Sequence, residues 1–210
     1  MERWCCHDRG GDIDRLTLTG DELAAGAYRM LSCLVLPRPI AWISTLSADG
    51  TGNLAPHSYF SIASPDPAVI TFSSVGTKDT LTNIEATGEF VVSLVPQELM
   101  ELANASSAPY EPGTDEAGLL DIPTEPSVAV APPRVAASPA SIECRLRQTI
   151  ALGTSTLVLG DVVAISVRRD ALGDDGLPAV AALRPVSRLG RDEWGLPPEV
   201  VHLPRPRRVD

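Results

Sequence analysis

The stretch from Pro37 to Thr80 reads PRPIAWISTLSADGTGNLAPHSYFSIASPDPAVITFSSVGTKDT, and it decides the fold. Its apolar residues come in short β-type runs, separated by a Gly-rich turn at 48–53 and a Pro-rich loop at 64–67. Asp-Gly between two such runs is a strong signal for a hairpin. The stretch ends in a hydroxyl-rich turn that opens a short helix. We interpret it as a phosphate-bearing cofactor site that the rest of the chain supports.

Outside this stretch, the chain alternates short apolar runs with helical patterns. The runs predict six or seven strands, at 31–36, 40–46, 54–61, 68–73, 89–95, 142–151 and 156–167. Helices are expected at 19–30, 78–88 and 96–104. Because the strands and helices do not alternate as βαβ units, a doubly wound parallel sheet is disfavoured. The pattern favours a mainly β protein, a closed antiparallel barrel with helical excursions.

Length and composition suit one domain with loose ends. The chain has 210 residues, of which 44% are hydrophobic and 21% charged, and it contains 19 prolines and 16 glycines. These values are ordinary for a globular domain that is rich in turns. We expect a loose N-terminal extension at 1–15, the barrel domain at 16–195 and a C-terminal tail at 196–210. The Pro-rich segment 105–140 is expected to be a long functional loop or an interface arm.

Charge and cysteine content exclude several classes of function. A net charge of −10 argues against non-specific nucleic-acid binding, which needs a basic face. The N-terminus has no signal-peptide pattern, and the apolar run 30–36 is too short to span a membrane. A cytoplasmic protein without a membrane segment is therefore expected. Cys5, Cys6 and His7 fall short of a four-ligand metal site, so a reduced extension is the favoured interpretation.

The turn 73–80 is the strongest single candidate for a binding site. A helix N-terminus presents unpaired N–H groups and a partial positive charge, both of which suit a phosphate. Lys78 adds a full positive charge, and Ser73 and Thr80 add hydroxyl donors. The alternative is a capped surface helix with an ordinary lysine. The turn is not a Walker A motif, since GxxxxGK[ST] is absent.

Other parts of the stretch carry weaker signals. Ser44 and Thr45 end one strand and face 53–56 across the Asp-Gly turn, where they can present donors to a flat polar ring or simply form the wet face of a hairpin. His57 is expected to be an exposed loop histidine. No GxSxG, HExxH or GxGxxG motif is present. The lack of an acid, base or nucleophile signature favours a cofactor that carries the chemistry.

Seven runs, in order, resemble a known family. They are PRPIAWIST, DGTGNLAPHSYFSIASPDP, KDTLTNIEATGEFVVSLV, PPRV, IEC, LGDVV and RPVSRLG, and they extend from about residue 28 to 194. This order is similar to the flavin reductase-like FMN-binding split-barrel family. The resemblance is strongest to flavoredoxin-like proteins and to the reductase components of two-component monooxygenases.

The resemblance implies a six-stranded antiparallel split barrel that forms a homodimer, with FMN near the dimer interface. It places the flavin phosphate at Ser73, Lys78 and Thr80. It places the isoalloxazine ring along Ser44, Thr45, Ala55 and Ser58. Arg184 and Arg188 are implied to shape the site or to reach the partner subunit. The chain departs from the family pattern at His57, Ser61 and Trp194, which bears on the electron donor and acceptor.

Three functions remain open at this point. The first is an NAD(P)H:FMN oxidoreductase, with NADH or NADPH as co-substrate, that passes electrons to a monooxygenase or another acceptor. The second is a non-enzymatic FMN electron-transfer protein without its own nicotinamide site. The third is a binding module for another ligand, such as haem or a pyridoxal phosphate-type compound.

Overall fold

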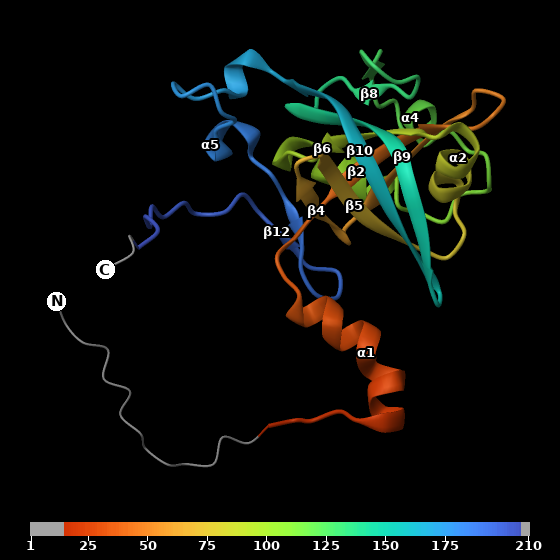
Figure 1. Cartoon of the computed structure of the whole chain (residues 1–210), viewed down its shortest axis with the longest axis vertical. Coiled ribbons are helices and arrows are strands. Elements are labelled where there is room, and N and C mark those ends of the chain that lie inside the picture. Colours follow the sequence, from red (N-terminus) through yellow and green to blue (C-terminus); the bar gives the residue numbers. More distant parts are fainter. Residues whose placement is uncertain (1–14, 207–210) are drawn as a thin grey trace.

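The fold is that of a computed structural model, which describes residues 15–206, so the expectations for Cys5, Cys6 and His7 lie outside the described residues. One antiparallel sheet dominates the molecule (Figure 1), and its seven strands are ordered β3-β2-β6-β9-β10-β5-β4. The strands are β2 (Ala41–Leu46), β3 (Gly52–His57), β4 (Phe60–Pro65), β5 (Ala68–Val75), β6 (Glu89–Leu94), β9 (Ala140–Leu152) and β10 (Ser155–Val167). The mainly β, antiparallel prediction is confirmed.

The two edge strands of this sheet are consecutive in the chain. β3 and β4 lie at opposite ends of the strand order, yet only Ser58 and Tyr59 separate them. The Ser73 N–H donates to the Tyr59 carbonyl at 2.9 Å, and β3 also contacts β5. The sheet therefore curls until its edges approach each other. The sequence pattern predicted six or seven strands, and the family resemblance implied six in the barrel. The large sheet has seven, because the run expected at 54–61 forms two strands at this bend while the run expected at 31–36 belongs to a helix.

Two small sheets and several short helices complete the described fold. β1 (Arg38–Pro39), β11 (Ser187–Arg188) and β12 (Trp194–Gly195) form a three-stranded sheet, and β7 (Thr124–Glu125) pairs with β8 (Arg134–Val135). The helices are α1 (Gly20–Leu34), α2 (Asp79–Thr87), α3 (Met100–Ala105), α4 (Glu116–Leu119) and α5 (Val180–Leu183), with 3₁₀ turns at Gln97–Leu99 and Arg169–Ala171. No helix among residues 15–206 is long and apolar enough to cross a membrane.

The main core lies on the concave face of the sheet. Phe72 and Phe90 are fully buried there, and their rings meet edge to face at 5.7 Å. Ile84 from α2 packs against the same cluster. Gly88, the predicted end of this helix, follows α2 in the left-handed region, at φ 74°. The helix begins at Asp79, and Lys78 is its N-cap. This core fixes the position of the α2 N-terminus relative to β5.

A second core covers the opposite face of β2, β3 and β6. Trp42 is fully buried and donates from Nε1 to Ser106 Oγ at 2.9 Å. The segment 105–140 contributes Ile122 and Val135 to this core. The segment expected to be a long functional loop or an interface arm is packed on the sheet and includes α4, β7 and β8. Although the segment is rich in proline, its apolar side chains pack on the face of β2, β3 and β6 that the main core leaves uncovered, because this burial removes apolar surface from water.

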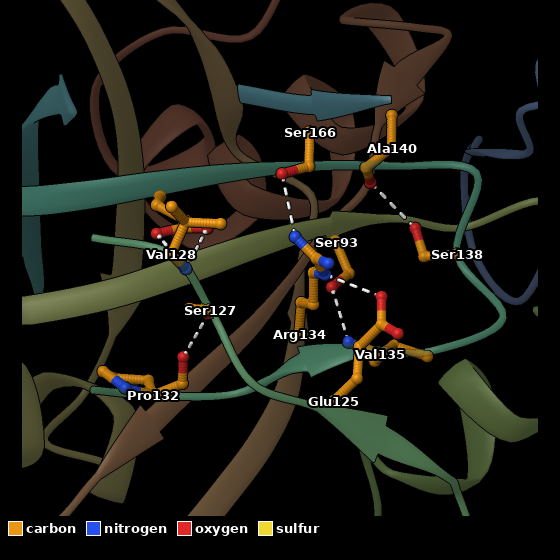
Figure 2. Close-up of polar contacts among 11 residues, drawn as sticks. Ser93, Glu125, Ser127, Val128, Pro132, Arg134, Val135, Ser138, Ala140 and Ser166 are labelled. Carbon is orange, nitrogen blue, oxygen red and sulfur yellow. Dashed lines mark hydrogen bonds and ion pairs between the residues drawn. The ribbon is translucent and has the colours of Figure 1, made fainter. Parts of the chain in front are cut away.

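Hydrogen bonds hold the same segment against β6, β9 and β10 (Figure 2). Arg134 donates to Glu125 at 2.7 Å and to Ser166 Oγ at 2.8 Å, and the Val135 N–H donates to Ser93 Oγ at 3.1 Å. The carboxylate of Glu143, which is fully buried, accepts from the Val128 and Ala129 N–H groups. This carboxylate replaces the water that those N–H groups would otherwise bind.

Helix α1 departs most from the sequence prediction. It was expected to end near residue 30 and to be followed by a strand at 31–36, but it continues to Leu34. The aliphatic run suits a helix as well as a strand, and a short apolar run alone cannot distinguish them. Thr19, the first residue of the predicted range, is the N-cap, and its side chain makes no capping hydrogen bond. The helix projects from the body of the molecule (Figure 1), and none of its residues is buried.

Candidate functional site

A large cavity lies between α1 and the curled sheet. Its volume is about 820 Å³, which is near the upper end of the roughly 300–1,000 Å³ range of ligand pockets. One wall comes from α1 and the β11–β12 hairpin, and the other from β3, β5 and the turn before α2. Three of the predicted site residues line it: Ser58, Ser73 and Lys78.

Ser73 and Lys78 form one polar end of this cavity. Ser73 lies on β5, whereas Lys78 is the N-cap of α2, with extended φ and ψ and no side-chain cap on the helix. The first N–H groups of α2 therefore lack a capping side chain next to an exposed ammonium group. Backbone N–H groups, a positive helix end and a lysine together form a suitable site for a phosphate.

Thr80 and Thr45 lie behind this end, in a buried polar network. Asn53 donates from Nδ2 to Thr45 Oγ1 at 3.2 Å and to Thr80 Oγ1 at 3.0 Å. Asn83 of α2 donates to Thr45 Oγ1 at 3.1 Å. His57 Nε2 lies 3.4 Å from Thr80 Oγ1. The network joins β2, β3 and α2 and supports the turn before α2. Of its members, only His57 lines the cavity.

His57 was expected to be an exposed loop histidine, but it is buried. Its side chain lies against the Phe72 ring, with the ring centres 4.9 Å apart, and it lines the inner end of the cavity. Burial lowers the pKa of His57 to about 4, and the positive charge of Lys78 contributes to this lowering. The imidazole is therefore neutral at pH 7, so Lys78 carries the full positive charge at this end.

The two remaining ring-contact predictions lie away from the cavity lining. Ser44 is buried in β2 between Val91 and Leu54 of the flanking strands. Ala55 pairs with Ile43 in the β2–β3 hairpin. A flavin contact at Ser44, Thr45, Ala55 or Thr80 remains a prediction. Arg184 is paired with Glu98 and also lies outside the lining, whereas Arg188 is part of it.

Arg38 stabilises the opposite wall of the cavity. In the sequence it lies between Pro37 and Pro39, a pattern that indicates only an interrupted strand. It is buried, and its guanidinium donates to the carbonyls of Ser32, Val35 and Leu189. It therefore ties the end of α1 to the C-terminal hairpin. It also lies over the Tyr59 ring, 5.8 Å from its centre.

Further lining residues were missed because the sequence does not show that α1 and the C-terminal hairpin lie together beside the sheet. Tyr28 and Arg29 line the cavity from α1, and Arg191 lines it from the turn before β12. A signal for the α1 face was available. Glu22, Gly26, Arg29 and Cys33 recur at helical spacing, and all four line the cavity. The first three lie within the helix predicted at 19–30, and only Cys33 lies beyond its predicted end.

The side chains present fit a phosphorylated aromatic cofactor such as FMN. Lys78, Ser73 and the α2 N-terminus match a phosphate dianion. Tyr28 and Tyr59 offer aromatic surface in the same cavity, which suits a flat ring. Burial raises the pKa of the Tyr59 phenol, and the nearby Tyr28 raises it further, so Tyr59 stays protonated and can donate. A curled antiparallel sheet with a cationic, aromatic cavity beside a helix N-terminus is therefore suited to a nucleotide cofactor.

Comparison with known proteins identifies the family. The "Flavin reductase like domain" matches residues 31–184, so the chain belongs to the flavin reductase-like family. An uncharacterised protein of Deinococcus radiodurans is 41% identical over 174 residues, covering 78% of this chain and 77% of its own.

Two solved structures show the same fold and share a quarter or more of their aligned residues with this chain. Nitrilotriacetate monooxygenase component B from Bacillus cereus is 28% identical, with a TM-score of 0.86, covering 91% of this chain and 100% of its own. The 2-nitrobenzoate 2-nitroreductase of Pseudomonas fluorescens is 27% identical, with a TM-score of 0.82, covering 89% and 93%. The resemblance to flavin reductase-like split-barrel proteins that the sequence motifs predicted is confirmed.

Proposed function

We propose that this protein is an NAD(P)H:FMN oxidoreductase that passes electrons from reduced flavin to a partner protein or another acceptor. One observation carries the proposal. A single cavity combines a phosphate-type end, Ser73 and Lys78 at the start of α2, with the aromatic side chains of Tyr28 and Tyr59. The family membership of the chain supports the same assignment.

FMN, when bound, would accept a hydride from the nicotinamide and release electrons to the acceptor. The chain's own residues would bind and orient it. Lys78 and the α2 N-terminus would hold the phosphate, and the buried network under Thr80 would keep that turn fixed. Ser58, beside Tyr59 in the cavity lining, offers a hydroxyl to the ring edge. No side chain of the cavity needs to act as an acid or base, which agrees with the neutral state of His57.

A homodimer is part of this proposal. Helix α1 leaves Leu23, Leu31 and Leu34 from 48% to 70% exposed, and burying such side chains favours association. The same helix forms one wall of the cavity. A second copy packed on α1 would fix that wall, in keeping with the FMN site near a dimer interface that the family resemblance implies. An electron acceptor such as a monooxygenase is proposed because a monooxygenase component B has the same fold.

The visible spectrum of the purified protein tests the function. With FMN added and unbound flavin removed, we expect a flavin absorption band that bleaches under anaerobic conditions when NADH or NADPH is added. A band that persists with both donors would refute the reductase and favour a non-enzymatic electron-transfer protein. A protein that retains no FMN would refute both, and would favour a module for another ligand. Size-exclusion chromatography with light scattering tests the dimer.

A further inference from the structure

We propose that Arg29, Arg188 and Arg191 form a second phosphate subsite of the cavity, which binds the phosphate groups of NADPH and selects it over NADH. This inference rests on the proposed function, because it identifies the electron donor of the same site. The three arginines come from α1 and the β11–β12 hairpin, whereas Lys78 precedes α2.

The first argument is an excess of positive charge. The chain has a net charge of −10, yet this cavity is lined by four arginines and one lysine, with Glu22 as the only carboxylate among the described lining residues. Lys78 and the α2 N-terminus suffice for one phosphate. Arg38 is held by three backbone carbonyls. The other three arginines provide positive charge that one FMN does not require.

The second argument is the way the hairpin presents two of these arginines. Arg188 lies over the Trp194 ring, 5.1 Å from its centre, and donates to the Arg191 carbonyl at 2.9 Å. Arg191 has a φ of 55°, in the left-handed region that non-glycine residues rarely adopt. Its ion pair with Glu193 is 3.3 Å long, and the two side chains are 73% and 52% exposed. Such a pair is weak, so Arg191 can exchange Glu193 for a ligand phosphate.

The third argument concerns the chemical class of the ligand. Arginine binds phosphate through two parallel hydrogen bonds, and it is the residue that accommodates the 2′-phosphate of NADP in dinucleotide sites. The three guanidinium groups carry three positive charges, whereas the pyrophosphate of a dinucleotide carries two negative charges. One positive charge is therefore available for a third phosphate group. A cavity of about 820 Å³ has room for more than the flavin. NADPH meets these conditions better than NADH.

Binding titrations on the FMN-loaded protein test the proposal without catalysis. NADP⁺ and NAD⁺, which do not reduce the flavin, serve as calorimetric probes. We expect NADP⁺ to bind roughly tenfold more tightly than NAD⁺, and Arg29→Gln combined with Arg191→Asn to remove most of that difference. Asparagine is chosen because it tolerates the left-handed backbone. Arg147→Gln, which changes an arginine on β9 outside the cavity, is the matched control.

The outcomes separate this inference from the function on which it rests. If the loaded protein binds NADP⁺ no more tightly than NAD⁺, or if the double variant binds NADP⁺ as the parent does, the subsite is refuted while the flavin assignment stands. Absence of FMN binding would instead refute the function. Arg29→Gln alone, an exposed change on α1, is the second variant should the hairpin change disturb folding. It is expected to weaken NADP⁺ binding and to leave FMN binding unchanged.

Discussion

Replacing Lys78 by alanine is the most direct test of the phosphate end of the cavity. A charge-assisted hydrogen bond to phosphate contributes about 1.5–3 kcal/mol. Lys78 is exposed, so solvent screens its charge, and the lower end of this range applies. We therefore expect Lys78→Ala to weaken FMN binding by about 1.5 kcal/mol, or roughly tenfold in Kd.

Quenching of flavin fluorescence measures this binding, and riboflavin provides the internal control because it lacks the phosphate. We expect the affinity for FMN to fall while the affinity for riboflavin stays within about twofold of the parent. We also expect the difference between parent and variant to shrink as salt rises, since the interaction is electrostatic. Equal FMN affinity in parent and variant would show that Lys78 does not contact the phosphate. An equal loss for riboflavin would show that the substitution acts through the fold of the turn.

Three further predictions concern stability, each measured by urea unfolding. The pKa of His57 is about 4 in the folded protein, against 6.5 for an unperturbed histidine. As the pH falls from 6.5 toward 4, His57 binds a proton in the unfolded chain but not in the folded protein, so the free energy of unfolding decreases. His57→Gln should reduce the loss between pH 7.5 and 4.5 by roughly 2–3 kcal/mol, and an unchanged pH profile would contradict this. Gly160→Ala would place a Cβ against the Phe90 ring, 2.8 Å from Cε1, and should cost about 1–3 kcal/mol, whereas Gly26→Ala in exposed α1 should cost nothing. Glu143→Gln should cost about 1–3 kcal/mol, because its amide group would face the N–H groups of Val128 and Ala129; the exposed Glu125→Gln should change stability by less than about 1 kcal/mol.

Local signals predicted the parts of the fold that depend on near neighbours. Asp49-Gly50 located the β2–β3 hairpin, and Gly88 located the end of α2, because each residue permits a backbone conformation that the chain needs at that point. The bend between β3 and β4 was missed because it depends on contacts with β5. The packing of 105–140 was missed for the same reason: Ile122 and Val135 become core residues only when the sheet offers them a face.

The candidate site was predictable only where it lies on one continuous segment. The turn from Ser73 to Lys78 carries its own hydroxyl, lysine and helix-start signals, so its place at the cavity was foreseeable. Arg38 was not, since its guanidinium reaches the carbonyl of Leu189, 151 residues further along the chain. The group of arginines at Arg29, Arg188 and Arg191 likewise depends on contacts between segments that are distant in the sequence. Arg29 and Arg191 meet in one cavity only because β1 pairs with β11 and aligns Arg38 with Arg188.

The two threonines that the family resemblance assigns to opposite ends of the flavin belong to one buried network. Thr45 and Thr80 share one neighbour, Asn53, whose Nδ2 donates to both hydroxyls. Both threonines are fully or almost fully buried, so their hydroxyl groups find their hydrogen-bond partners inside the protein. Fully satisfied buried networks restrict motion. The hydroxyl groups of Thr45 and Thr80 therefore help to hold the β2–β3 hairpin against α2. On this support, Ser73 and Lys78 line the cavity and are the residues that we propose to bind the phosphate.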